Sequence, residues 1–480
     1  MIKKLFAIFL FFVVCTHALT IRIDDIKQIR ADIRVTESQF QEKDGEIIVE
    51  ASVTNTGESS KLLYLAEEMN EIVVVVKPIG VIGPNTKADA TIKIQTQYMK
   101  ETYRERRFVL FLEKDLDEKY PGRYFIVNED WSKYESSITE MVVKSNILTI
   151  PVIALIIVIF IYLISTAISS GPFHAEHLFF PKTTTIYEDI ANILINPITW
   201  MVEIVIILVM GLVINFYYGG GTDILWPHIF LMSIVGALLF PIIYLAMGWF
   251  LGRKKRINMP LKFFWGLFLY GAVAAYMAFV INTLLVGFVR GFAITDVAYL
   301  ILTAAVLAPI IEEVVKLLGL FITSLHIEFN DSITGLLFGF AIGVGFSFIE
   351  NWFYFSSRTD PLTLGFYPWI QLIIYRSVFN SLAHGVVTGI GGAIIGHVKS
   401  LTSDPKIIVV SWLVAVLLSI PLHAMFNVSA ILDGSVSREY IFGLPSLFNP
   451  LIVIFLLMIF VITYVVTFNE KINKRKVGDC

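Results

Sequence analysis

The chain has 480 residues, of which 56% are hydrophobic and only 16% are charged, and its mean hydropathy is +0.74. Soluble globular proteins carry about 25% charged residues. The formal net charge of -3 leaves no basic surface for nucleic acid. These values exclude a disordered chain, a nucleic-acid-binding protein and an ordinary cytosolic enzyme. They predict a multi-pass protein of the cell membrane, with the lipid bilayer as its main partner.

Residues 1–18 have the pattern of a secretory signal peptide. Lys3 and Lys4 precede an apolar run from Leu5 to Val14, and Thr16 and Ala18 supply small residues for a cleavage site. An uncleaved anchor is the alternative. Because the apolar run is short for crossing the hydrocarbon, we favour cleavage.

Residues 19–145 differ sharply in composition, since they are rich in charges and contain no long apolar run. Apolar and polar residues alternate in short segments, which is typical of strands with one buried face. Several such strands predict an extracytoplasmic, Ig-like β-sandwich that recognises or spaces a partner. The segments are Ile29–Val35, Ile47–Val53, Val73–Val76, Ile92–Ile94 and Phe108–Leu112.

The remaining chain is predicted to be an all-α bundle of nine membrane spans, each of about 20 apolar residues. Residues 146–296 carry four spans, 297–430 the next four, and 431–468 an outer loop and the ninth, before a cytoplasmic tail at 469–480. The basic cluster Arg253–Arg256 and the lysines of the tail both fall inside with this count. The expected spans are 147–168, 197–217, 225–251, 261–289, 297–324, 332–355, 367–397, 407–430 and 447–468.

Ionisable residues inside spans usually face protein or water and mark functional sites. The last five spans hold an unusual set of them. Glu312 with Lys316, and His423 with Asn427, are each spaced to lie on one helix face. The other members are Glu313, Glu350, Arg376 and His384.

Gly335, Gly339 and Gly343 form a small-residue ridge at steps of four, and Glu350 continues that face. Such a ridge allows a neighbouring helix to approach closely. We therefore expect Glu350 to point into the bundle. The predicted topology allows all these groups to meet in one hydrated site in the outer half of the bilayer.

These motifs carry a family resemblance. Glu312-Glu313-x-x-Lys316, the glycine-rich Phe346-x-x-x-Glu350, Arg376 followed by His384, and His423-x-x-x-Asn427 occur in this order on successive spans. The array resembles the PrsW family of intramembrane glutamic proteases, which is related to CAAX prenyl proteases and bacteriocin-processing enzymes. The resemblance covers about residues 297–430.

The resemblance implies an intramembrane endopeptidase that cuts a membrane-anchored protein or peptide with glutamate-activated water. Glu312 or Glu313 would be the base, and His423 with Asn427 would hold the oxyanion. Lys316 resembles the family's basic partner, and its pairing with Glu312 leaves Glu313 the better candidate for the base.

Three further residues have expected roles. Where the prenyl proteases carry a histidine, this chain has Glu350, so a pair of glutamates aided by His384 would share a proton. Arg376 is expected to be an ion-pair partner.

The sequence favours catalysis without a cofactor. Three glutamates and two histidines can bind a divalent metal, but the His-Glu-x-x-His motif of zinc proteases does not occur. We therefore prefer metal-independent catalysis, and a role for a divalent metal is left as an alternative. A proton-coupled transporter or channel and a non-enzymatic sensor or scaffold are the alternative functions. The substrate, the scissile bond and the oligomeric state also stay open.

Overall fold

The computed structural model describes residues 20–22, 33–43, 46–55, 58–69, 72–95, 103–112, 124–169, 192–194, 196–218, 225–253, 261–290, 296–326, 328–402, 404–436 and 448–478. The expected signal peptide lies outside these ranges. The chain forms two compact units, Met1–Ile138 and Thr139–Cys480, and each is considered by itself.

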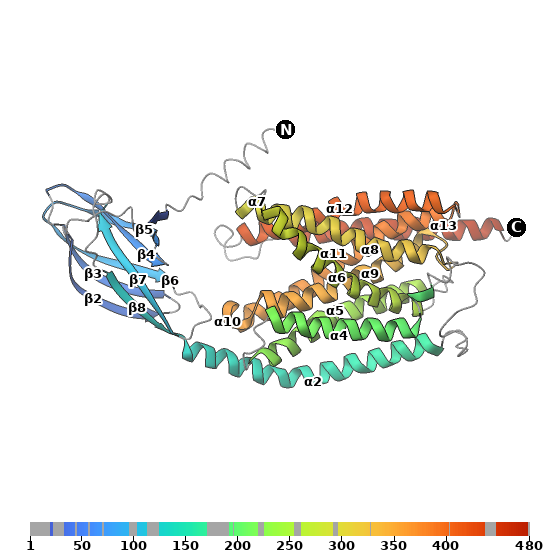
Figure 1. Ribbon diagram of the computed structural model, residues 1–480, viewed down its shortest axis with the longest axis horizontal. Helices are drawn as coiled ribbons and strands as arrows, with labels where there is room; N and C mark the ends of the chain where they lie inside the picture. The colour runs from blue at the N-terminus through green and yellow to red at the C-terminus, as the bar shows by residue number, and fades with distance from the viewer. Residues whose placement is uncertain are drawn as a thin grey trace. The chain divides into compact units, whose positions relative to one another are not determined.

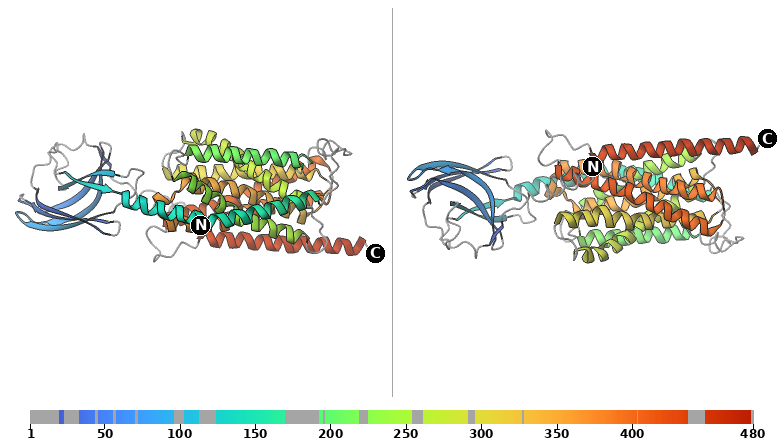
Figure 2. Two further views of the ribbon diagram at one scale, coloured as in Figure 1. Left: turned by 90° about the horizontal axis from the view of Figure 1, so that it is seen from below. Right: turned by 90° about the horizontal axis from the view of Figure 1, so that it is seen from above.

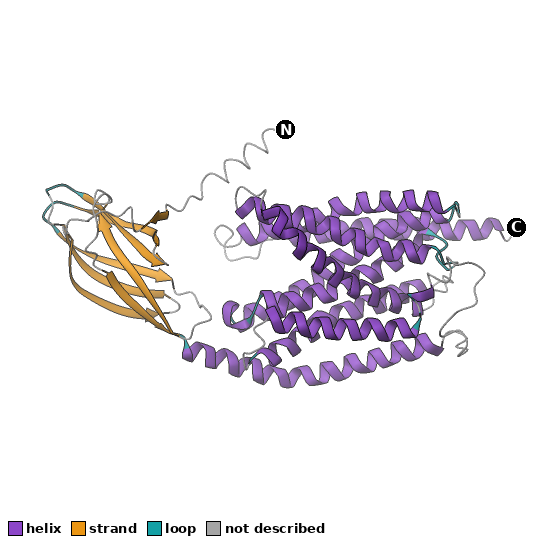
Figure 3. Cartoon of the chain, viewed as in Figure 1, coloured by secondary structure: helices purple, strands orange, loops and turns teal. Residues whose placement is uncertain are grey.

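The first unit is rich in antiparallel strands (Figure 3). One sheet has the order β1-β5-β4-β7-β8 and the other the order β2-β3-β6. The strands are β1 (Thr20–Arg22), β2 (Ile33–Lys43), β3 (Glu46–Asn55), β4 (Lys61–Met69), β5 (Ile72–Ile82), β6 (Lys87–Gln95), β7 (Tyr103–Leu112) and β8 (Tyr124–Asp130).

Four of the expected strand segments lie within β3, β5, β6 and β7, and the fifth is described only from Ile33, where β2 begins. The buried Asn55 ends β3, and its amide donates to the carbonyls of Ile82 and Gly83, both at 3.1 Å. An Ig-like sandwich made from the two sheets stays a prediction.

The second unit is helical, and its long helices run side by side (Figures 1 and 2). In the described part of the chain, eight helices are long and apolar enough to cross a membrane. They are α2 (Ser132–Ser169), α4 (Pro197–Tyr218), α5 (Trp226–Arg253), α6 (Leu261–Arg290), α9 (Ser332–Phe353), α11 (Phe366–Lys399), α12 (Pro405–Val436) and α13 (Phe448–Gly478). Helix α2 begins well before the apolar run expected near residue 147.

The expected span at 297–324 is helical throughout but is divided. It consists of α7 (Asp296–Leu300), the π-helix η3 (Ile301–Leu307) and α8 (Ala308–Ser324). Helix α8 alone has 17 residues, and this divided helix is therefore not one of the eight. A second π-helix, η4 (Tyr354–Arg358), continues α9, and the short α10 (Pro361–Leu364) precedes α11.

Helix α9 is the centre of this unit and is buried along its length. Its glycine ridge lies directly against the backbone of α11, because a Cβ at Gly335, Gly339 or Gly343 would overlap the carbonyl of Gly392, Thr388 or His384, respectively. The expected close approach at this ridge is confirmed. It brings the polar residues of α9 and α11 together.

Candidate active site

Seven of the eight predicted site residues form one connected polar cluster inside the helical unit. Helix α8 supplies Glu312, Glu313 and Lys316, and α9 supplies Glu350. Arg376 and His384 come from α11, and His423 comes from α12. Spacings of three, four and eight residues place Glu312 and Glu313 with Lys316, and Arg376 with His384, on shared helix faces. The cluster thus joins residues from four helices.

Glu313 is fully buried and has close partners. Its Oε1 lies 2.6 Å from Lys316 Nζ and 2.9 Å from His423 Nδ1. The Thr388 hydroxyl donates to Oε2 at 3.5 Å. Glu313 is therefore held by α8, α11 and α12 together.

Lys316 is also fully buried, and it connects His384 with Glu313, the carboxylate that bonds His423. Besides Glu313, its Nζ lies 2.9 Å from His384 Nδ1 and 4.3 Å from the centre of the Phe346 ring. If Lys316 donates to Nδ1, the His384 proton resides on Nε2. That nitrogen lies 2.7 Å from Glu350 Oε2.

Glu350 is held by a polar stripe on α11. The guanidinium of Arg376 donates to its Oε1 at 2.9 Å, and the amide of Asn380 donates to its Oε2 at 3.3 Å. The Glu350 side chain is 33% exposed, so this end of the cluster reaches the surface of the bundle.

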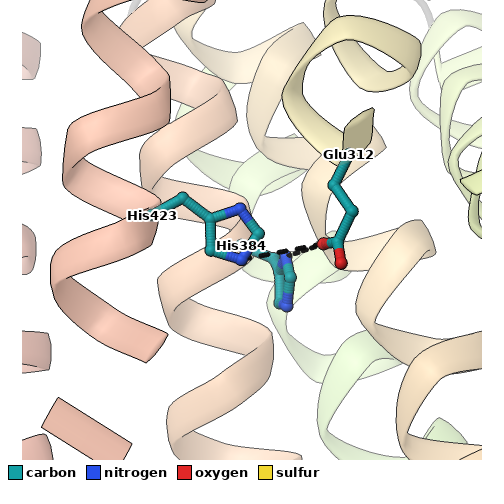
Figure 4. A group of neighbouring side chains, drawn as sticks. All are labelled: Glu312, His384 and His423. Atoms are coloured by element: carbon teal, nitrogen blue, oxygen red, sulfur yellow. Dashed lines mark ion pairs between the residues drawn. The ribbon is translucent and has the colours of Figure 1, made fainter. Parts of the chain in front are cut away.

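Glu312 differs from the other two carboxylates. Its Oε2 is buried and makes no hydrogen bond within the described part of the chain, although its side chain is 12% exposed. This oxygen lies 3.6 Å from His423 Nε2 and 4.0 Å from His384 Nδ1, and Figure 4 shows both imidazoles beside it. With Nδ1–H on Glu313, His423 Nε2 is also an acceptor.

The set Glu312, His384 and His423 suits a divalent cation. One ligand atom from each lies within 4.8 Å of the others. The second nitrogen of each imidazole lies against a carboxylate, Glu313 or Glu350, which is the usual support of metal-bound histidines. Three carboxylates face only two fixed cations, Lys316 and Arg376, and this also favours a further positive charge. Lys316 shares His384 Nδ1, so a metal there would replace that contact.

Asn427 lies one turn from His423 on α12, but its amide donates to the Ala304 carbonyl of η3 at 2.7 Å. Its expected partnership with His423 around an oxyanion stays a prediction. Sequence reasoning missed Asn380 and Thr388. Both follow the spacing of four that runs from Arg376 through His384, and this spacing was the available signal.

Comparison with known proteins agrees with this site. No curated protein and no solved structure matches the chain. Residues 259–466 match the family model described as PrsW family intramembrane metalloprotease. That description does not support the expected glutamic class or the absence of a metal. The matched segment contains every residue of the cluster, so the expected resemblance to the PrsW family is confirmed over residues 259–466.

Proposed function

We propose that this chain is an intramembrane endopeptidase in which Glu312 activates the water that attacks the peptide bond. The observation that carries the proposal is the pair Glu312 Oε2 and His423 Nε2, which lie 3.6 Å apart. Within the described residues Glu312 Oε2 makes no hydrogen bond, and Lys316 Nζ lies 3.7 Å from it. Two acceptors at this distance suit a water that donates to both. The surrounding side chains are held in place by the buried Lys316–Glu313 ion pair and the partly exposed Arg376–Glu350 ion pair. Fixed positions of this kind are what catalysis requires.

The reaction follows from these positions. Glu312 takes a proton from the water while the water oxygen bonds to the carbonyl carbon of the substrate. The carbon–nitrogen bond of the tetrahedral intermediate then breaks, and Glu312 returns the proton to the leaving nitrogen. The products are a carboxylic acid and an amine, which ionise to a carboxylate and an ammonium group.

The neighbours of Glu312 position it. Glu313 orients the His423 ring through Nδ1, and Glu350 orients His384 through Nε2. Of the two groups that the resemblance assigns to the oxyanion, His423 lies at the cluster. Glu313 is fully buried and occupied by Lys316 and His423, which favours Glu312 over Glu313 as the base.

If Glu312, His384 and His423 hold a divalent cation, the cation would polarise the substrate carbonyl and the water, and Glu312 would then be its ligand rather than the free base. Glu313 and Glu350 would support His423 and His384 with or without it, whereas Lys316 would lose its contact with His384 Nδ1. Because the cluster lies among membrane-spanning helices, the proposed substrate is a membrane-anchored protein or peptide cut in or near the bilayer.

Purified chain in liposomes tests the proposal with a membrane-anchored reporter peptide. Glu312→Gln should lower kcat by about 10²–10⁴-fold, the usual contribution of general acid–base catalysis. The fold should survive, because Glu312 Oε2 has no hydrogen bond to lose. Glu203→Gln is the matched control, because Glu203 is also a buried carboxylate with an unpaired oxygen, on α4.

Full cleavage by Glu312→Gln would refute the proposal. Proton flux through the liposomes, lost in Glu312→Gln while no reporter is cut, would support the transporter alternative instead.

A further inference from the structure

The carbonyl of Ala304 lies where η3 meets α8, and the local backbone denies it a helical partner. In an α-helix its donor would be the N–H of Ala308, but that N–H bonds to the Thr303 carbonyl. In a π-helix its donor would be residue 309, which is Pro309 and has no N–H. The π-helix and the proline together leave this carbonyl without a donor from its own helix.

Asn427 supplies the missing donor from another helix. Its Nδ2 lies 2.7 Å from Ala304 O. Ala304 is half-buried, and a carbonyl without a donor is costly in the apolar surroundings of a membrane-spanning bundle. This bond therefore ties α12 to η3.

The same face of α12 makes a second contact with the divided helix. His423, one turn before Asn427, bonds Glu313 at 2.9 Å. The two contacts lie on either side of Pro309, one on η3 and one on α8. Together they fix both the rotation and the height of α12 relative to the two glutamates.

We propose that Asn427 is a positioning residue that sets His423 Nε2 opposite Glu312 Oε2 by completing the hydrogen bonding of the Ala304 carbonyl. This inference rests on the proposed function for its effect on turnover, but the contact itself can be tested without it. It gives Asn427 a role different from the oxyanion donor that the family resemblance implies.

Pro309→Ala provides a specific rescue. Alanine restores an N–H at position 309, and the Ala304 carbonyl then has a donor within its own helix. Asn427→Ala should lower kcat about 10²-fold, as expected for a small displacement of reacting groups. Adding Pro309→Ala should recover at least about tenfold of this loss. Asn427→Asp, which keeps the shape but loses the donor, should resemble Asn427→Ala.

A double-mutant cycle on thermal stability tests the contact independently of activity. Asn427→Ala and Pro309→Ala should be non-additive, with a smaller fall in Tm for the Asn427→Ala change when residue 309 is alanine. Asn449→Ala is the matched control. Asn449 lies on α13, and its amide donates to the Phe426 carbonyl of α12 at 3.3 Å. Its effect on Tm should add to that of Pro309→Ala.

Additive Tm effects for Asn427 and Pro309 would overturn the inference, as would a loss of kcat that Pro309→Ala leaves unchanged. The latter result is what an oxyanion donor predicts, since a new backbone N–H at 309 cannot replace a donor to the substrate. If the wild-type chain cleaves nothing, the proposed function fails, and the Tm cycle still decides the role of the Asn427 contact.

Discussion

Glu313 and His423 lie 2.9 Å apart, Oε1 to Nδ1, although 110 residues separate them in the chain. The bond directs the other nitrogen of His423 toward Glu312, whose Oε2 makes no hydrogen bond within the described residues. The adjacent residues Glu312 and Glu313 therefore have different roles in the proposed reaction. Glu313 holds an imidazole, and Glu312 is left available for chemistry.

Replacing Lys316 with Met should strongly destabilise the protein. Lys316 is fully buried and is the close cation of Glu313, and removal of one partner of a buried ion pair typically costs about 3–5 kcal/mol. Thermal unfolding in detergent measures the effect. Lys144→Met is the matched control, since Lys144 forms an exposed pair with Glu140 on α2, and it should leave the Tm unchanged. Equal Tm values for the two variants would show that the buried Lys316–Glu313 pair does not stabilise the fold.

Replacing Gly343 with Ala should separate α9 from α11. The new Cβ would overlap the carbonyl of His384 itself, and overpacking of this kind costs about 1–3 kcal/mol. Reporter cleavage should fall more than the loss of Tm explains, because the contact of His384 with Glu350 depends on this approach. Gly287→Ala on α6 is the control, as its Cβ would meet no atom within 4 Å. A Gly343→Ala protein with normal turnover would show that the spacing of the two helices is unimportant.

The convergence of the polar residues was predictable for two reasons. Helix periodicity fixes the face on which each lies, and the free-energy cost of a charged side chain in the bilayer favours contact among them. Charged groups on separate spans are stabilised by each other, and a spacing of four fixes the face on which they lie. The glycine ridge also identified the face of α9 that meets α11. The same motifs also predicted the match of residues 259–466 to the PrsW family.

Two features of the site were not predictable from spacing. Glu312 and Glu313 are adjacent in sequence, and only the position of α12 determines which of them bonds His423. The division of the expected span by η3 was also missed, because a π-helical turn leaves the apolar pattern intact. Pro309 was the visible signal, but its consequence depends on the hydrogen bonds of Ala308 and Asn427.

From the basic clusters we propose that the C-terminus lies in the cytoplasm and the β-rich unit outside. In a Cys15→Ser variant, Cys480 is the one remaining cysteine. An impermeant maleimide should label it only after the cells are permeabilised. Lys87→Cys at an exposed position of β6, combined with Cys480→Ser, should be labelled in intact cells. Labelling of Cys480 in intact cells would reverse the proposed topology.

Purified protein should carry about one divalent metal ion per chain, held by the Glu312, His384 and His423 side chains. Elemental mass spectrometry measures the content directly, and it requires no substrate. His423→Gln should reduce the content, because it removes a ligand supported by Glu313. His397→Gln is the control, since His397 lies near the end of α11 against Ser332. Chelation should abolish reporter cleavage, and re-addition of the metal should restore it. A metal-free wild-type protein that keeps full activity in chelator would instead favour catalysis by Glu312 and water alone.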